Sequence, residues 1–377
     1  MAVNKKAKKF DIHSYQKKLD NSLQKLKEST ILTETQKRDI LDFVNELKDT
    51  GLSVPRIHKY VYTLDYYAGW FGKEFKDIDK DDIIETVREH VDGNDEISDA
   101  TKYHYKVALR RFFWWFCSRD KPPDMREYPE MVRWIKPKSV DNESKLPEEI
   151  LSEADIMKLL ETDTHARNKA MVAVLFNSGT RVGEFLNLRL RHVEIDQFGA
   201  SITVMFSKTK PRKIRMAFAS PYLVTWVNIH PFKNNPDAYL WCPFNSGGTK
   251  GRDKSQPLSY QNLVKILQLM RADAGVMKGV NPHAFRHAAA TFDAISGMTE
   301  VMMRQKYGWS KNSKMPSIYI HLAQKDMDDF ELRRAGLSRD VKKPGEGIKP
   351  LQCPRCEFIN KATTNYCDRC GLPLNNI

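Results

Sequence analysis

The chain has 377 residues, 41% of them hydrophobic, which is long enough for two domains with hydrophobic cores and a small appendage. Its longest apolar runs, residues 170–176 and 112–117, are far shorter than a membrane span, which needs about 20 residues. No apolar segment follows the lysines within residues 5–9, as it would in a secretory signal. We therefore expect a cytoplasmic protein rather than a membrane or secreted one. The net charge of +13 favours polyanionic partners, although the charge alone fits an unrelated basic enzyme equally well.

The N-terminal third of the chain reads as a helical domain. Residues 1–10 form a basic arm, and we place the domain at residues 11–135. Capping side chains and periodic apolar residues predict four helices in it. They begin at Thr33 or Thr35, Ser53, Asp79 and Asp99, and they end near Lys48, Gly72, His90 and Cys117.

The last of these four helices carries two different faces. Its aromatic and leucine side chains recur at helical spacing and fit a hydrophobic core. Lys102, Lys106 and Arg110 repeat every four residues on another face. This basic stripe is either a DNA-binding face or a solvated helix surface, and its spacing alone leaves both interpretations open.

A polar segment without periodicity, residues 136–148, predicts a linker to a second domain at residues 149–337. Ser152 and Asp155 form a capping-box pattern at the start of that domain. Residues 338–350, which contain two prolines and two glycines, predict a second linker. We expect helices over 153–161, 165–178, 180–190, 259–273, 283–295, 299–306 and 319–336, and two strands, Ser201–Phe206 and Lys213–Phe218, joined by a basic turn.

Four ionisable residues of the second domain suit the binding of a phosphate. Arg181 lies in the segment Ser-Gly-Thr-Arg-Val-Gly-Glu at the start of a helix, and Lys208 lies in the basic turn. Asn281 predicts a helix start that puts His283 in the first turn, where free backbone N–H groups favour an anion. Arg286 follows three residues later and shares the face of His283.

Two aromatic residues complete an ordered set of six. Trp309 lies 23 residues after Arg286, and Tyr319 lies ten residues after Trp309. Taken singly, each of the six has a structural explanation, such as a surface arginine, a helix cap or a core ring. Together they resemble the signature of the tyrosine recombinases and integrases, which is an Arg in a Gly-x-Arg-x-x-Glu box, a Lys in a β-hairpin, His-x-x-Arg, a His or Trp, and a Tyr.

The resemblance covers about residues 11–336, because the helical N-terminal part is also similar to the SAM-like core-binding domain of that family. It implies a mainly α fold: a helical SAM-like DNA-binding domain followed by an α+β catalytic domain of helices with a small antiparallel sheet. Two positions depart from the usual pattern. Trp309 stands where most members carry His, and Pro316 lies just before the expected nucleophile.

The resemblance implies that Tyr319 attacks a DNA phosphorus and forms a 3′-phosphotyrosyl intermediate. Arg181 and Arg286 would bind the non-bridging oxygens, and His283 would assist the phenol. The bond energy is stored in the protein–DNA ester, so strand exchange would need neither ATP nor a metal.

The remaining members of the set receive supporting roles from the resemblance. Lys208 would protonate the leaving oxygen, with Lys210 as the competing candidate in the same turn. Trp309 would donate its indole N–H to the phosphate and pack the site. Glu184 would orient Arg181 or Lys208.

The implied partner is double-stranded DNA, bound by a nucleoid-associated protein. The resemblance predicts a homotetramer on two recombination sites that exchanges a C-terminal segment, around residues 322–336, although an isolated monomer remains possible. A type IB topoisomerase-like nicking enzyme and a non-catalytic DNA-binding regulator are the alternatives; a zinc-dependent nuclease fails because no carboxylate cluster is evident for two metals. The residues predicted to contact DNA are Lys102, Lys106, Arg110, Lys210 and Arg212.

Four of the six cysteines lie within the last 25 residues, as two Cys-x-x-Cys knuckles separated by ten residues. Four thiolates in this spacing suit a tetrahedral zinc ion. Residues 351–377 therefore resemble a short zinc ribbon, which would depend on a structural Zn²⁺ to fold. A disulfide pair or a redox motif is the alternative. The four predicted ligands are Cys353, Cys356, Cys367 and Cys370.

Overall fold

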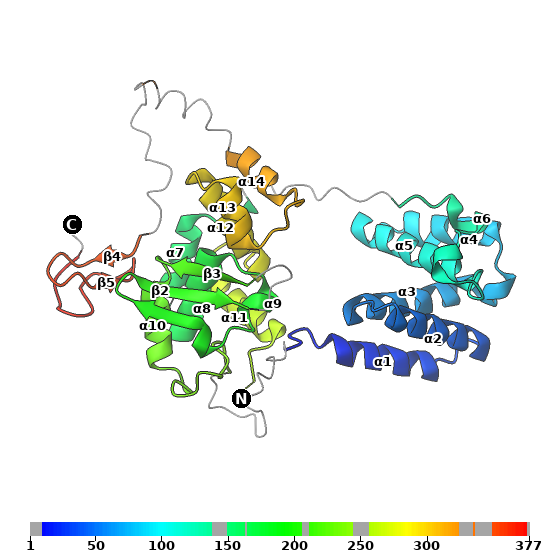
Figure 1. The fold of residues 1–377 in the computed structure, drawn as a ribbon, viewed down its shortest axis with the longest axis horizontal. Coiled ribbons are helices and arrows are strands. Elements are labelled where there is room, and N and C mark those ends of the chain that lie inside the picture. The colour runs from blue at the N-terminus through cyan, green and yellow to red at the C-terminus, as the bar shows by residue number, and fades with distance from the viewer. Residues whose placement is uncertain are drawn as a thin grey trace. The chain divides into compact units, whose positions relative to one another are not determined.

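The computed structural model describes residues 10–137, 149–162, 164–205, 211–243, 256–323, 335 and 349–374, and it divides into two compact units (Figure 1). The helical unit comprises His13–Glu143, and the C-terminal unit comprises Met1–Ile12 together with Ser144–Ile377. The domain limits drawn from the sequence stay predictions, because most of both linkers lies outside the described residues. Among the residues that are described, no helix combines the length and the apolar character that crossing a bilayer requires.

The helical unit is built from helices of very different lengths. Its elements are α1 (Tyr15–Glu28), α2 (Glu34–Asp49), α3 (Val54–Phe71), η1 (Phe75–Asp77), α4 (Lys80–Thr86), the π-helical turn η2 (Val87–Asp92), α5 (Asp99–Phe116), η3 (Pro123–Met125) and α6 (Glu130–Arg133). Their buried faces meet in an aromatic-rich core that includes Phe43, Tyr67, Phe112 and Trp115. The four predicted helices are present, and α1 was not predicted as a separate helix.

Capping side chains set several of these helix starts. Thr33 accepts a hydrogen bond from the N–H of Gln36, and Asp79 caps α4 in the same manner. The predicted cap of α5 was one residue too late: Ser98, not Asp99, accepts the hydrogen bond from the N–H of Thr101. Asp99 instead lies in the first turn, where its negative charge is favourable.

The C-terminal unit combines helices with a small antiparallel sheet. Its elements are α7 (Glu153–Glu161), α8 (Ala166–Ser178), α9 (Val182–Phe185), η5 (Leu190–His192), β1 (Val193–Asp196), β2 (Gly199–Val204), β3 (Arg212–Met216), α10 (Ser220–Asn228), α11 (Tyr260–Asp273), α12 (Pro282–Ile295), α13 (Glu300–Tyr307), α14 (Met315–Ala323), β4 (Leu351–Gln352) and β5 (Ile359–Asn360). The strands β1, β2 and β3 pair in that order, with Ile202 opposite both Val193 and Ile214. The expected fold class, mainly α with a small antiparallel sheet, is confirmed.

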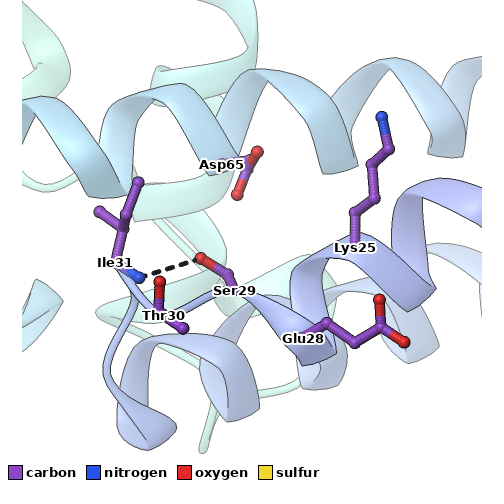
Figure 2. Close-up of a pocket in the computed structure, with 6 residues that line it drawn as sticks. All are labelled: Lys25, Glu28, Ser29, Thr30, Ile31 and Asp65. Atoms are coloured by element: carbon purple, nitrogen blue, oxygen red, sulfur yellow. Dashed lines mark hydrogen bonds between the residues drawn. The ribbon is translucent and has the colours of Figure 1, made fainter.

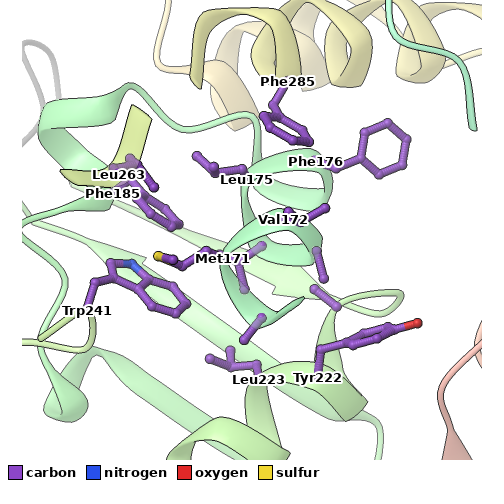
Figure 3. Close-up of a cluster of buried hydrophobic side chains, with 14 of the residues drawn as sticks. Met171, Val172, Leu175, Phe176, Phe185, Tyr222, Leu223, Trp241, Leu263 and Phe285 are labelled. Carbon is purple, nitrogen blue, oxygen red and sulfur yellow. The ribbon is translucent and has the colours of Figure 1, made fainter. Parts of the chain in front are cut away.

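Helix α8 is the central element of this unit. Its apolar run is buried, and Figure 3 shows Met171, Val172 and Leu175 among side chains from other elements, including Trp241 and Phe285. The helix ends at Gly179, which has a positive φ of 54°. A Cβ at that position would collide with the ring of Tyr307, so the turn that leads into α9 requires glycine.

Several predicted elements differ from the structure. The predicted helix 180–190 is only α9 (Val182–Phe185), because the chain beyond it leaves the helix and exchanges backbone hydrogen bonds with Ala238 and Leu240. Helix α10 and strand β1 were not predicted. Helix α14 begins at Met315 rather than at 319, since Pro316 fits a first helical turn. The rest of that predicted helix lies largely outside the described residues.

Both ends of the described chain contact the C-terminal unit. The N–H of Phe10 donates to the Asn187 side chain at 2.8 Å, and Ile12 is buried in the main core of the unit. The cysteine module contacts α10 through a 3.3 Å hydrogen bond between the hydroxyls of Thr363 and Tyr222. These contacts anchor an N-terminal segment and the cysteine module to the same unit.

Candidate active site

Two arginines meet at the carbonyl group of Tyr307. Arg181, the N-cap residue of α9, donates to the carbonyls of Tyr307 at 3.4 Å and Gly308 at 3.1 Å. Arg286, from α12, donates to the carbonyls of Gly179 at 2.6 Å and Tyr307 at 2.8 Å. The Arg181 side chain is 31% exposed, whereas Arg286 is only 6% exposed. Two of the predicted residues are therefore neighbours, one at the surface and one beneath it.

The surroundings of Arg286 destabilise its positive charge. Burial, and next the positive charge of Arg181, lower the pKa of Arg286 to about 10. A lowered pKa for a base means that its charged form is less stable here than in water. An anion held against the two guanidiniums would oppose this destabilisation and accept their forked N–H donors. The pair is suited to a phosphate group.

Glu184 lies between two guanidiniums. It pairs with Arg181 at 3.2 Å and with Arg212, from β3, at 2.7 Å, and its carboxylate also accepts the backbone N–H of Arg181 at 3.0 Å. Burial acts to raise the pKa of Glu184, but the hydrogen bond and charge of Arg212, together with those of Arg181, hold the pKa below its usual value. Glu184 therefore contacts Arg181, one of the two residues that it was expected to orient.

Arg212, which was predicted to contact DNA, is buried inside the C-terminal unit. Its side chain is 5% exposed, and its guanidinium donates to Glu184 and, at 2.7 Å, to the carbonyl of Lys306. Strand β3 alternates buried and exposed residues, and Arg212 falls on the buried side with Ile214 and Met216. Because its donors are used inside the protein, we correct the expectation that Arg212 contacts DNA: it supports Glu184 instead.

The phenol of Tyr319 is buried, and the charge of Arg286 acts on it. Tyr319 is 2% exposed, and its ring stacks on Trp309 with centroids 5.7 Å apart and planes 9° apart. Trp309 stacks in turn on Tyr307 at 4.8 Å, and the guanidinium of Arg286 lies 5.5 Å from the Trp309 ring centroid. Burial raises the pKa of Tyr319 to about 12, opposed by the charge of Arg286. The phenol is therefore protonated at neutral pH.

A histidine that the sequence did not single out contacts this phenol. The hydroxyl of Tyr319 lies 2.6 Å from Nδ1 of His287. His283, the predicted helper, is exposed one turn earlier on α12, and the two imidazole rings are 5.6 Å apart. The available signal was the spacing, because residues four apart share a helix face.

The predicted lysines of the basic turn, Lys208 and Lys210, lie outside the described residues, so their expected roles stay predictions. The basic stripe on α5 is described, and its members have partners within the protein. Lys102 donates to the backbone carbonyl of Asp92 at 3.0 Å, and Lys106 pairs with the carboxylate of the same residue at 2.6 Å. Arg110 lies over the ring of Tyr128 at 4.0 Å. These contacts compete with any contact to DNA.

A second group of cations lies between α3 and α5. The charges of Arg111 and Arg56 both act on the phenol of Tyr60, and Arg56 is exposed. Burial, and next the charge of Lys59, lower the pKa of His104 on α5. Within the described part of the chain, Arg56, Lys59 and Arg111 have no carboxylate partner, but Arg111 lies over the ring of Trp114 at 4.0 Å, as Arg110 does over Tyr128. We call the three cations Arg56, Lys59 and Arg111, together with the neighbouring imidazole of His104, the α3–α5 basic face.

The four C-terminal cysteines form a cluster whose sulfur atoms all lie within 4.8 Å of one another. The Cys353 and Cys370 sulfurs are 3.5 Å apart, and those of Cys356 and Cys367 are 3.6 Å apart. A tetrahedral ion with bonds of about 2.3 Å requires sulfurs about 3.8 Å apart, so the geometry fits zinc and no disulfide is formed. These four cysteines could hold a metal ion.

The thiol pKa values of this cluster diverge. Burial opposes ionisation of Cys367, but backbone N–H groups of its knuckle outweigh burial and lower the pKa of Cys367 to about 6. The N–H of Phe358 lowers the pKa of Cys356, yet burial and the neighbouring cysteines raise it to about 12. Such divergence follows when thiolates are held close together, and a divalent cation would compensate their mutual repulsion.

A depression on the helical unit lies among residues of α1, α3 and the loop after α1 (Figure 2). Its lining residues are Lys25, Glu28, Ser29, Thr30, Ile31 and Asp65. The side chain of Ser29 accepts a hydrogen bond from the backbone N–H of Ile31 at 3.3 Å, which is a local turn contact. None of these residues belongs to the predicted site, and they bring together no set of groups that suggests catalysis.

Comparison with known proteins bears on the arginine and tyrosine cluster. Residues 149–326 match the sequence model of the phage integrase family. Tyrosine recombinase XerA of Saccharolobus solfataricus is 22% identical over 312 residues, which cover 80% of this chain and 94% of XerA. Tyrosine recombinase XerD of Neisseria meningitidis serogroup B is 27% identical over 257 residues, covering 67% of this chain and 81% of XerD.

Solved structures share the fold. The XerH site-specific recombinase in its post-cleavage complex with the palindromic difH substrate has a TM-score of 0.57 at 19% identity, covering 87% of this chain and 98% of that one. The lambda integrase dimer bound to a COC′ core site has a TM-score of 0.55 at 15% identity, covering 75% and 94%. The family inferred from six ordered residues is thus confirmed: residues 149–326 match the phage integrase family, and the chain is similar to tyrosine recombinases over most of its length.

Proposed function

We propose that this tyrosine recombinase cuts and rejoins DNA through a covalent bond between Tyr319 and a 3′ phosphate, and that Arg181 and Arg286 bind the phosphate during the exchange. The observation that carries the proposal is the meeting of the two guanidiniums at the Tyr307 carbonyl, with the Tyr319 ring stacked beside them on Trp309. A phosphodiester resists attack because it is negatively charged, and two forked donors offset that charge. Loss of one such donor typically costs about 10²–10³ in rate.

The chemistry also requires proton transfers at both ends of the breaking bond. Lys208 or Lys210 would protonate the departing 5′ oxygen, as the family resemblance implies. Glu184 keeps the Arg181 guanidinium oriented, and Trp309 covers the face of the phenol. Because the energy of the broken bond is kept in the phosphotyrosyl ester, rejoining needs no ATP.

We place the main DNA contact of the helical unit on the α3–α5 basic face rather than on the predicted α5 stripe. Cations without a carboxylate partner release condensed counterions when they bind phosphates. Lys102 and Lys106 are already bound to Asp92, so their contribution would first require breaking those contacts. Arg56 and Lys59 have no contact with a carboxylate to break before they bind a phosphate.

Assembly and the metal complete the proposal. The XerH and lambda integrase structures hold DNA recombination sites, and the latter is a dimer. By analogy, this chain would assemble on paired sites as a homotetramer that exchanges the segment after α14. The four cysteines would hold a structural Zn²⁺ that leaves no ligand position open for catalysis.

The test is covalent trapping on a nicked suicide DNA substrate that contains the target site. Wild-type protein should form a denaturation-resistant protein–DNA adduct at Tyr319, and the Tyr319→Phe variant should bind the same DNA with unchanged affinity but form none. Adduct in the variant would refute the assignment. A companion assay with two sites on one plasmid separates recombination from relaxation alone, which a topoisomerase-like enzyme would give.

A further inference from the structure

We propose that His287 is the group that accepts the proton of the Tyr319 phenol when the tyrosine attacks DNA. The inference rests on the proposed function, since it concerns the activation of the same nucleophile. The family pattern that identified the other residues gave His287 no role, and the structure supplies it through one short contact.

The contact has the direction that proton transfer requires. Tyr319 is sealed from solvent at 2% exposure, so its hydroxyl must find a partner within the protein. The phenol holds its proton and donates it, which leaves Nδ1 of His287, 2.6 Å away, as the acceptor. His287 therefore presents an unprotonated Nδ1 to the phenol, with its own proton on Nε2.

The surroundings favour His287 over other bases near Tyr319. His283 lies a helical turn earlier, and its ring is 5.6 Å from that of His287 on the exposed side. Arg286, whose charge acts on the phenol, donates hydrogen bonds from both terminal nitrogens to backbone carbonyls and has no lone pair to accept a proton. Trp309 lies parallel to the phenol and offers only an N–H donor.

The step balances without any further reactant. The O–H bond of Tyr319 breaks and its proton passes to Nδ1 of His287, giving an imidazolium. The phenolic oxygen forms a bond to phosphorus, the bond from phosphorus to the 5′ oxygen breaks, and that oxygen takes a proton from the general acid of the basic turn. In the rejoining direction the imidazolium returns its proton to the departing phenolate.

The test measures the single-turnover rate of covalent adduct formation for wild type, His287→Asn and His287→Ala. Asparagine keeps an oxygen near the position of Nδ1 and so keeps a hydrogen bond to the phenol, but an amide cannot take up a proton at neutral pH. We expect H287N to slow adduct formation by about 10²-fold or more, the usual contribution of general acid–base catalysis, with unchanged DNA affinity. H287A should be equally slow, and added imidazole should accelerate it in proportion to its concentration.

A second substrate separates the base from the acid. Replacing the bridging 5′ oxygen by sulfur gives a leaving group that needs no proton. The His287 variants should remain slow on it, whereas variants of the general acid should recover. An H287N rate within about threefold of wild type, a full recovery of H287N on the sulfur substrate, or an H287A protein that binds DNA and ignores imidazole would each overturn the role of His287. If wild type itself forms no adduct at Tyr319, the proposed function fails as well, and this outcome is distinct from the others.

Discussion

Replacing Glu184 by glutamine removes the carboxylate that Arg181 and Arg212 share and keeps the shape of the side chain. The Glu184 and Arg212 side chains are 3% and 5% exposed, so water cannot replace the lost partner. Breaking a buried ion pair by removing one member costs about 3–5 kcal/mol. The amide oxygen keeps part of the hydrogen bonding, so we expect E184Q to lower the free energy of unfolding by about 3 kcal/mol and Tm by about 6–12 °C.

The neighbouring sheet offers a matched control. Glu194 pairs with Lys213 at 2.5 Å, but their side chains are 59% and 51% exposed. An exposed pair contributes about 0–1 kcal/mol, so E194Q should leave Tm almost unchanged. Thermal unfolding followed by circular dichroism compares the two variants directly. If E184Q melts within about 2 °C of E194Q, burial of the charged pair is not what stabilises this part of the fold.

The pH dependence tests whether charge or shape is responsible. The folded pKa of Glu184 is depressed, because Arg212 and Arg181 outweigh the effect of burial. A carboxylate of this kind stabilises the fold above its unfolded pKa of about 4.3, and the stabilisation is lost as pH falls through the lower folded value. The Tm difference between wild type and E184Q should be full at pH 7 and shrink below about pH 4. A constant difference would point to packing alone.

Three further predictions concern other parts of the chain. Gly179→Ala should lower the free energy of unfolding by several kcal/mol, because the new Cβ collides with Tyr307 and the φ is unfavourable for alanine. Gly275 has a similar φ of 62° but open space around it, so Gly275→Ala should lower that free energy by only about 1 kcal/mol. Thermal unfolding compares the two variants. R56Q and K59Q should each weaken DNA binding and reduce the slope of log K against log salt by about 0.9, while K106Q should change it less. Purified protein should release about one zinc ion per chain to a chelator, measured by a colorimetric dye, with loss of the cysteine module's fold but not of adduct formation; release of none would contradict the metal assignment.

Features set by neighbouring residues could be predicted from the sequence. Asn281 accepts hydrogen bonds from the N–H groups of His283 and Ala284, both at 3.0 Å, as its position before a proline suggested. Glu184, three residues after Arg181, reaches back to the backbone N–H of that arginine. Such contacts lie within a single turn, so sequence spacing determines them.

Features set by distant contacts could not be predicted. The hydrogen bond between His287 and Tyr319 spans 32 residues, and the pair of Arg212 with Glu184 spans 28. The predicted strand began at Lys213, which left Arg212 in the basic turn with the surface cations. Extending the strand by one residue would have put Arg212 on the buried face, because strand residues alternate.

The balance of charge in the arginine cluster explains why the fold suits an anionic substrate. Arg181, Arg212 and Arg286 carry three positive charges, and Glu184 supplies one negative charge to the contacts described between them. Glu184 is shared by Arg181 and Arg212, so one positive charge remains on these three residues and a second on Arg286. Burial and the charge of Arg181 lower the pKa of Arg286 to about 10. The charged form of Arg286 is thus destabilised in the free protein. Burial of apolar side chains, such as those of α8, supplies the free energy of folding that offsets this destabilisation. A phosphodiester bound against Arg286 and Arg181 would remove the destabilisation, so part of the free energy of binding is built into the folded chain before DNA arrives.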